Sequence, residues 1–473
     1  MNGEQTVGTV SPFDTVVRDA LIVGDETQEI ADIAISNGRI AQLGGTPSGQ
    51  HEIRAEGMIV TPGGIDMHVH FTPMPGANPR PDDFRSGSLA AANGGITTVG
   101  NMTHQRPGEG LMAALNREAS LAETQSIVDF VLHPVLNNPT AEAINEIGEL
   151  RPAGHGTIKI FMVFPSFDAS HAAYEAAMAM AAKVDVRVLI HCEDPEVINT
   201  QLEQLSQQGR LGPENYARSR PVRSELVAVE RALTLAETTG AEIHIVHLAS
   251  ADALDLCTRA RKRGVRVSVE TRPLYLHLTE KVFDRPDAVL YSGNPPPRTE
   301  SDRDALWTAL ASGDVDVVAS DHAPWNKAEK SAAGADIRSA LPGLPELDTM
   351  LPMIFSEGVT KGRLSLGQFV RITAKRPAEL LGLSPTKGTI SVGADADLVV
   401  WDPHRKWTVE AEFLSTRTDY SPYEGWELEG APIFTMVRGA LVRTPDGPIA
   451  GSQRGRLAKT HRTPPIETSD IPG

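Results

Sequence analysis

The two ends of the chain share short segments in which apolar and polar residues alternate. Residues 32–44, DIAISNGRIAQLG, alternate around Asn37-Gly38, a dipeptide typical of a two-residue hairpin turn. Residues 394–403 and 431–442 show the same alternation. These patterns predict β-strands at both ends, and we expect the two ends to form one small β-domain together.

The middle of the chain alternates apolar runs with stretches of helical spacing, such as 109–124 and 222–240. Eight such strand–helix units over roughly 260 residues predict a (β/α)8 barrel. A doubly wound open sheet is the alternative, and the absence of a glycine-rich turn after the first run disfavours it. The apolar runs occupy residues 65–70, 96–100, 127–133, 157–163, 186–191, 242–247, 265–270 and 315–320.

These patterns divide the chain of 473 residues into a barrel and an accessory β-sandwich, a size that suits more than one domain. The predicted parts are 1–61 (N-terminal part of the β-sandwich), 62–385 (barrel), 386–456 (C-terminal part of the β-sandwich) and 457–473 (polar tail).

The composition narrows the possible partners and the compartment. A formal charge of −17 argues against nucleic acid or an anionic membrane, because phosphate binding needs a basic face. Cys192 and Cys257 are too few for a disulfide framework. With no visible signal peptide and no long apolar stretch, the sequence predicts a cytoplasmic protein.

Histidines end three of the apolar runs, where the active site of a barrel is expected. His68 and His70 are two residues apart, so they point to the same side of a strand and could grip a metal ion. His191 and His247 end buried runs in which a polar side chain needs a partner. Each one alone could be a core or surface histidine, but their joint position favours a metal site. His244 is expected to face away from the barrel interior as a structural histidine.

A lysine and an aspartate complete this set. Lys159 lies between Ile158 and Ile160 in an apolar run, where a buried ammonium would be costly. A lysine that has taken up carbon dioxide is instead an anion able to bridge two metals; the alternative is an amine that reaches the barrel mouth. Asp321 follows the last run as an anionic ligand or a helix N-cap. Four histidines, one carboxylate and one carbamate would serve two divalent ions.

Motifs along nearly the whole chain resemble the hydantoinase, dihydropyrimidinase and allantoinase branch of the amidohydrolase superfamily. They are GGIDMHVH, DDFRSGSLAAANGGITTV, KIFMVF, LIHCED, HIVHLAS, VETRPLYLHLT, NPPPRTESDRDALW, ASDHAP, KGTISVGADADLVVWDP and DYSPYEGWELEG.

The resemblance implies a (β/α)8 barrel with a β-sandwich from both termini, two metal ions, usually zinc and sometimes manganese or cobalt, and a homotetramer or dimer. It makes one metal site of His68, His70 and Asp321 and a second of His191 and His247. Carboxylated Lys159 would bridge the two.

The implied reaction opens the ring amide of a hydantoin, dihydropyrimidine or allantoin-like ureide. Asp321 would take a proton from the attacking water and return it to the leaving nitrogen, acting as base and then acid.

The sequence departs from the family pattern at positions that contact substrate. Thr72 stands where dihydroorotases carry an arginine, which disfavours dihydroorotate. Phe164 replaces a tyrosine whose hydroxyl helps to hold the oxyanion in hydantoinases. Asn294 begins Asn-Pro-Pro-Pro-Arg where the family has Ser-Pro-Pro-x-Arg, and Gly343 lies where the family closes over the substrate. We expect Phe164, Asn294 and Gly343 to bind substrate.

Three phenylalanines lie near the bridging lysine. Phe161 is expected in the core, whereas Phe164 and Phe167 fit an apolar wall of the substrate site as well as they fit core packing.

Two other functions stay open. The same scaffold could act on a different amide or a lactone, which the departures at Thr72 and Phe164 allow. A non-catalytic assembly protein of the collapsin response mediator type is disfavoured, because all six ligand positions carry competent residues.

Overall fold

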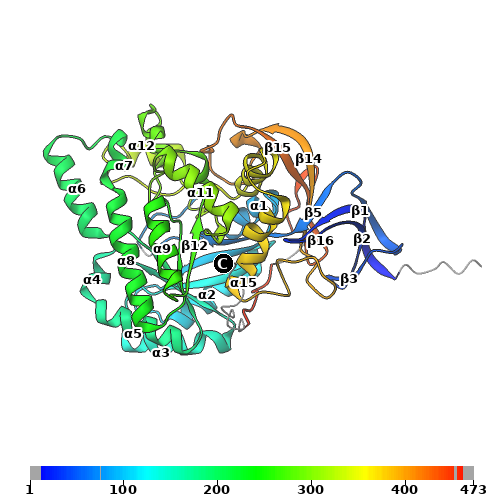
Figure 1. Cartoon of the computed structure of the whole chain (residues 1–473), viewed down its shortest axis with the longest axis horizontal. Helices are drawn as coiled ribbons and strands as arrows, with labels where there is room; N and C mark the ends of the chain where they lie inside the picture. Colours follow the sequence, from blue (N-terminus) through cyan, green and yellow to red (C-terminus); the bar gives the residue numbers. More distant parts are fainter. Residues whose placement is uncertain (1–11, 75, 452–454, 462–473) are drawn as a thin grey trace, which may run out of the picture.

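The computed structural model describes residues 12–74, 76–451 and 455–461 and contains two sheets (Figure 1). One sheet has eight strands, and every pair of neighbours in it is parallel. The other has nine strands, both parallel and antiparallel. Figure 1 shows helices around the first sheet and the second sheet at one side.

The eight-stranded sheet is the predicted barrel. Each of the eight apolar runs overlaps one strand, and the strands follow one another around the sheet in chain order. The strands are β6 (Gly64–Val69), β7 (Ile96–His104), β8 (Asp129–Val135), β9 (Thr157–Phe161), β10 (Arg187–His191), β11 (Ile243–Ile245), β12 (Val267–Thr271) and β13 (Val317–Val318). The predicted (β/α)8 architecture is confirmed.

Contacts between the first and last strands nearly close the barrel. A carboxylate oxygen of Asp66 accepts hydrogen bonds from the backbone N–H groups of His68 (3.0 Å) and Ser320 (3.1 Å). The N–H of His70 donates to the carbonyl of His322 at 2.9 Å. The ends of β6 and β13, which carry the predicted metal ligands, therefore lie side by side.

Helices surround the barrel, and longer ones such as α2 and α8 bury an apolar face. Capping side chains begin several of them, such as Asp83 before α1 and Thr299 before α11. The α-helices are α1 (Phe84–Asn93), α2 (Leu111–Gln125), α3 (Ala141–Ala153), α4 (Pro165–Ala169), α5 (His171–Lys183), α6 (Pro195–Gln207), α7 (Tyr216–Ser219), α8 (Val222–Thr239), α9 (Ala251–Lys262), α10 (Pro273–His277), α11 (Glu300–Ser312), α12 (Lys327–Ala333), α13 (Met350–Ile354), α14 (Leu366–Val370) and α15 (Arg376–Leu381). Short 3₁₀ and π segments are η1 (Pro213–Asn215), η2 (Glu280–Asp284), η3 (Ala288–Tyr291), η4 (Phe355–Thr360), η5 (Arg371–Lys375) and η6 (Ala411–Phe413). Within the described ranges, none of these helices has the length and apolar character needed to cross a bilayer.

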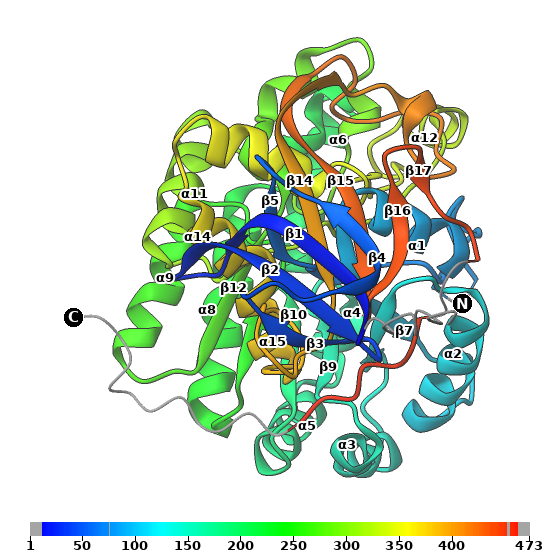
Figure 2. The same cartoon turned by 90° about the vertical axis from the view of Figure 1, so that its right-hand side faces the viewer.

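The nine-stranded sheet unites both ends of the chain, as predicted (Figure 2). Its strands are β1 (Phe13–Val23), β2 (Gln28–Ser36), β3 (Arg39–Leu43), β4 (Gly49–Arg54), β5 (Ile59–Pro62), β14 (Leu398–Thr408), β15 (Glu427–Val437), β16 (Ala440–Thr444) and β17 (Gly447–Pro448). The two ends meet where β5 pairs with β14 in antiparallel fashion. Asn37 and Gly38 have φ values of 51° and 77°, which the predicted two-residue hairpin turn requires.

An apolar cluster joins the N-terminal and C-terminal strands of this sheet. Its members include Val17, Ile33, Val60, Leu398, Val400 and Met436. The divisions at 61/62 and 385/386 stay predictions. The predicted tail begins with residues that pair with the barrel, because the N–H of Ala458 donates to the carbonyl of Phe130 at 2.8 Å. Residues 462–473 lie outside the described part.

Candidate metal centre

Three of the predicted ligands meet where β6 and β13 end. The Nε2 atoms of His68 and His70 lie 3.2 Å apart. Oδ1 of Asp321 lies 3.1 Å from Nε2 of His70 and 3.4 Å from Nε2 of His68. One ligand atom from each residue therefore lies within 4.8 Å of the other two, a spacing that suits a single metal ion.

The other two histidines form a second pair beside the first. Nδ1 of His191 lies 2.9 Å from Nε2 of His247. The rings of His68 and His247 stack with their centroids 5.5 Å apart. The four imidazoles thus form one continuous group across the mouth of the barrel.

Lys159 lies on β9 in the same group and is fully buried. Its Nζ has no hydrogen-bond partner in the described structure and lies 4.8 Å from the centre of the Phe161 ring. Burial lowers the pKa of its amine from 10.5 to about 8, because the surrounding protein disfavours the charged form. A larger fraction of this buried amine is therefore neutral at neutral pH than of an exposed lysine.

Two of these six residues have left-handed backbone conformations. The φ values are 40° at His247 and 49° at Asp321, a region that non-glycine residues rarely occupy. Each residue comes shortly after its strand ends, at Ile245 and at Val318. The backbone therefore turns both side chains towards the site, and strain of this kind is typical of functional positions.

Two glutamates orient the histidine rings, and the sequence analysis missed both. Glu270 lies 2.9 Å from Nδ1 of His68 and accepts the backbone N–H of His247 at 3.0 Å. Glu193 lies 2.9 Å from Nε2 of His191 and accepts Nε of Arg220 at 2.9 Å. A carboxylate on the far ring nitrogen fixes the tautomer of a metal-binding histidine. Glu270 lies inside a buried apolar strand, as Lys159 does, and Glu193 follows the strand that ends at His191.

His244 also contacts Glu270, at 3.3 Å from Nε2. It therefore points into the barrel, and the predicted orientation was wrong. The alternation along β11 ends before His247, whose positive φ reverses the expected side. His244 is a structural histidine as expected, because its Nδ1 also bonds to Ser268 at 2.8 Å.

Asp321 is held as an anion. Burial alone would raise its pKa, but Arg272 at 2.6 Å and the two histidines hold the pKa well below 3.8. Arg272 is itself fixed by Glu346, whose Oε2 accepts Nε at 3.0 Å. Asp321 is thus ionised at neutral pH.

The donor set fits a pair of divalent cations. Imidazole nitrogens and a carboxylate converge, and Nδ1 of His247 as well as Nζ of Lys159 has no partner within the described residues. Buried polar atoms without partners are rare unless a further ligand completes the site. His68, His70, Asp321, His191, His247 and Lys159 could therefore hold metal.

The predicted substrate residues lie on different segments. Phe164 is half-buried before α4, with its ring 5.3 Å from that of Phe161. Oδ1 of Asn294 accepts the hydroxyl of Tyr216 at 2.6 Å. Gly343 has a φ of 119°, and its carbonyl accepts Nζ of Lys330 at 2.8 Å. Their contact with substrate stays a prediction.

Of the neighbouring phenylalanines, Phe161 differs from the expectation of a core position, and Phe167 takes the core position that was one of its two alternatives. Phe161 is half-buried, with its ring 5.6 Å from that of His191, so it faces the site instead of the core. Phe167 packs against Tyr174 at 4.9 Å in the core. Phe161 lies two residues after Lys159 on β9, so strand alternation turns both side chains to the same side, whereas Phe167 lies on α4, beyond the strand.

Two further basic groups lie at the mouth. Arg80, in the loop after β6, donates to the carbonyl of Ala323 at 2.8 Å and packs over the ring of Trp325 at 4.7 Å. His104 ends β7 with its ring 6.4 Å from that of Phe161. The sequence analysis identified neither residue.

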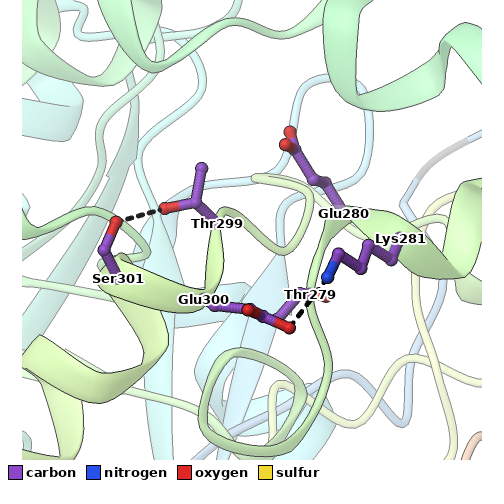
Figure 3. A pocket seen from close by; sticks show the side chains of 6 residues that line it. All are labelled: Thr279, Glu280, Lys281, Thr299, Glu300 and Ser301. Carbon is purple, nitrogen blue, oxygen red and sulfur yellow. Dashed lines mark hydrogen bonds and ion pairs between the residues drawn. The ribbon is translucent and has the colours of Figure 1, made fainter.

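Two other features are separate from this centre. Asp129, Asp395 and Asp397 also cluster, but Lys387 lies 2.7, 3.3 and 2.5 Å from them. An exposed hollow beside α11 contains none of the predicted site residues (Figure 3). It is lined by Thr279, Glu280, Lys281, Thr299, Glu300 and Ser301.

A (β/α)8 barrel with histidines, an aspartate and a buried lysine at its strand ends defines the class of metal-dependent barrel hydrolases. Residues 59–442 match the amidohydrolase family. The chain is 36% identical to a D-hydantoinase of Rhizobium radiobacter over 436 residues, 91% of this chain and 95% of that protein. It is 34% identical to a D-hydantoinase of Ralstonia pickettii over 455 residues, 95% of this chain and 99% of that protein.

Solved structures agree with these relatives. A D-hydantoinase superimposes with a TM-score of 0.92 at 33% identity, covering 96% of this chain and 100% of that one. A dihydropyrimidinase from Brevibacillus agri NCHU1002 gives 0.91 at 30% identity, covering 95% and 99%. The chain belongs to the amidohydrolase family, in its hydantoinase and dihydropyrimidinase branch. It is a hydrolase that acts on carbon–nitrogen bonds of cyclic amides.

Proposed function

We propose that this protein uses two metal ions to open the ring amide of a small cyclic amide or ureide of the hydantoin, dihydropyrimidine or allantoin type. The observation that carries the proposal is the convergence of five ligand side chains at the barrel mouth, together with Lys159 on β9, a buried amine without a partner in the described structure.

His68, His70 and Asp321 would hold one ion, and His191 and His247 the other. Lys159 would join them after its neutral amine adds to carbon dioxide and releases a proton, which gives a carbamate anion. When bound, a pair of divalent ions supplies a water of lowered pKa and polarises the attacked carbonyl.

Asp321 would move the proton. Its pKa lies well below 3.8, so it is ionised at neutral pH and can accept the proton of the attacking water. It would return that proton to the ring nitrogen as the carbon–nitrogen bond breaks. The product is an N-carbamoyl or amide-bearing acid.

Three residues would position the ring. Phe164 supplies an apolar wall beside Phe161, while Asn294 and Gly343 lie on segments joined by Lys330, whose Nζ donates to Ser292 (3.1 Å) and to Gly343. Because Phe164 has no hydroxyl, the same site could also accept a different amide or a lactone.

We further propose zinc as the metal, with manganese or cobalt as alternatives, a homotetramer or dimer, and a cytoplasmic location. Three histidine nitrogens and a carboxylate are ligands that suit zinc. Cys192 and Cys257 are both buried and unpaired, as thiols of a reducing compartment are.

The test is a ring-opening assay of metal-free protein, and of the same protein after addition of zinc or manganese with bicarbonate. Hydantoin, dihydrouracil, allantoin, dihydroorotate, simple cyclic imides and a lactone serve as substrates. Opening of a cyclic amide only after reconstitution supports the proposal. Two bound metals with lactone opening alone would favour the alternative chemistry. No reaction in the reconstituted protein would contradict both.

A further inference from the structure

The segment between β14 and β15, residues 409–426, connects two strands of the nine-stranded sheet but is bonded to the barrel. The backbone N–H of Arg417 donates to Asp82 at 3.0 Å, and Asp82 lies in the loop after β6. The same carboxylate lies 3.0 Å from Nε2 of His322, the residue after Asp321. The segment therefore reaches the end of the barrel at which the predicted metal ligands lie.

A chain of buried polar side chains leads from this segment to Asp321. The hydroxyl of Tyr423 donates to Oε1 of Glu346, and Oε2 of Glu346 accepts Nε of Arg272 at 3.0 Å. Nη1 of Arg272 donates to Oδ2 of Asp321 at 2.6 Å. Tyr423, Glu346 and Arg272 are all fully buried, so these hydrogen bonds form in a region of low dielectric, where they are stronger than in water.

Arg272 determines which oxygen of Asp321 faces the histidines. Its bond to Oδ2 leaves Oδ1, which lies 3.1 Å from Nε2 of His70 and 3.4 Å from Nε2 of His68. The planar guanidinium fixes this arrangement, because Nη1 holds Asp321 while Nε and Nη2 donate to Glu346. A rotation of the carboxylate would break the bond to Arg272 and move Oδ1 away from the two imidazoles.

A simple structural ion pair is the alternative, because a buried guanidinium needs an anionic partner in any fold. Glu346 already provides that partner, since its Oε2 accepts both Nε and Nη2 of Arg272. The bond from Nη1 to Asp321 comes in addition. Tyr423 occupies the other oxygen of Glu346 and so holds Oε2 towards Arg272. These two further bonds are required for positioning Asp321 but not for neutralising the arginine.

We propose that Arg272, Glu346 and Tyr423 position Asp321 for metal binding. Through them, a segment outside the barrel controls the affinity of one of the two proposed metal sites, the one that contains Asp321. All three residues act through Asp321 and take no part in the chemical step. This inference rests on the proposed metal site and does not depend on the ring-opening reaction.

The test measures the affinity of metal-free protein for zinc by competition with a chelator. Tyr423→Phe removes one hydroxyl and keeps the ring. The double variant Arg272→Met/Glu346→Met removes both charges of the buried pair together, so that neither is left unpaired, and a triple variant adds Tyr423→Phe to it. Tyr174→Phe is the matched control, because Tyr174 is also buried and its hydroxyl donates to the carbonyl of Leu136 at 3.1 Å.

Tyr423→Phe should weaken the binding of one zinc ion roughly fivefold, as expected for the loss of one hydrogen bond, and that of the other ion less. The double variant should weaken the same ion roughly 10- to 100-fold. The triple variant should match the double variant, because Tyr423 acts on Asp321 only through the pair that is already lost. Tyr174→Phe should bind both ions as the wild type does.

Two results would overturn the inference. One is an affinity for zinc in Tyr423→Phe equal to that of the wild type. The other is a further fivefold loss when Tyr423→Phe is added to the double variant, because the tyrosine would then act on the fold as a whole. The comparison of Tyr423→Phe with Tyr174→Phe decides the case even where the double variant does not fold.

A ring-opening assay of the same samples separates this inference from the proposed function. Weaker zinc binding in Tyr423→Phe, with no ring opened by the wild type, would support the inference and contradict the proposed reaction. Ring opening by the wild type, with unchanged zinc binding in Tyr423→Phe, would support the reaction and overturn the inference.

Discussion

Lys159 and Lys387 are two buried lysines with opposite surroundings. Lys387 donates to Asp129 at 2.7 Å and to Asp397 at 2.5 Å, where the barrel meets the nine-stranded sheet. Lys159 is as buried, but its amine has no partner in the described structure. Lys387 thus stabilises the contact between two parts of the fold, whereas Lys159 presents an unpaired amine within the described part of the site.

The pKa values of the two amines move in opposite directions. Burial lowers both, but at Lys387 the three aspartates outweigh it and raise the pKa above 10.5. At Lys159 burial prevails, and the pKa falls to about 8. Only a neutral amine adds to carbon dioxide, and the amine of Lys159 is more readily neutral because burial outweighs the charges of Glu270 and Asp321, which act to raise its pKa.

Replacement of Lys159 should have the largest effect on activity. Lys159→Met removes the bridging anion, so we expect loss of metal and a fall in kcat/KM of at least about a thousandfold. Stability should change little, because a buried amine without a partner is removed. Ring opening and thermal unfolding measure the two effects. A metal-loaded, active variant would refute the role of Lys159.

The same substitution at Lys387 should have the reverse effect. Lys387→Met leaves three crowded carboxylates, with Arg438 beside Asp129 and the exposed Arg39 beside Asp395. The free energy of unfolding should therefore fall by about 3–5 kcal/mol. Denaturant unfolding gives the free energy, and elemental analysis of the folded fraction should show metal content like that of the wild type. An unchanged free energy of unfolding would show that the cluster does not stabilise the contact between the barrel and the nine-stranded sheet.

Replacement of Glu270, the carboxylate that contacts Nδ1 of His68, should have a smaller effect. Glu270→Gln removes the charge that holds the ring, so metal affinity should fall roughly 10- to 100-fold. A competition titration with a chelator measures it. Glu118→Gln is the control, because Glu118 is equally buried but paired with Arg117 on α2. Equal losses in both variants would mean a general effect of buried charge.

The smallest predicted effect is a pH dependence of activation. The pKa of Lys159 is lowered to about 8, and the neutral fraction rises as pH rises through that value. At constant dissolved carbon dioxide, the activation rate of metal-free protein should rise roughly fivefold from pH 7 to pH 8. A rate independent of pH over this range would contradict the lowered pKa.

Much of the site was predictable because a polar residue at the end of an apolar strand is a strong local signal. His68, His70, His191, His247 and Asp321 carry this signal, Lys159 instead interrupts an apolar run, and the barrel brings these positions together. The eight strands were also predictable, since each overlaps a buried apolar run.

The remaining features depend on contacts between distant segments. Glu270 pairs with His68 across 202 residues, and no local pattern indicates such a partner. Arg80 lies in a loop rich in proline and glycine that has no periodicity. The predicted orientation of His244 was wrong because the backbone turns at His247, where strand alternation no longer applies.

The central claim is that a carboxylated Lys159 joins two metal ions. The most direct test is metal content per chain, measured together with the ¹³C NMR spectrum of protein reconstituted with zinc and ¹³C-bicarbonate. We expect two metal ions per chain and a carbamate signal that is absent in Lys159→Met and present in Lys387→Met. One metal ion or none in the reconstituted wild type, without a carbamate signal, would contradict it.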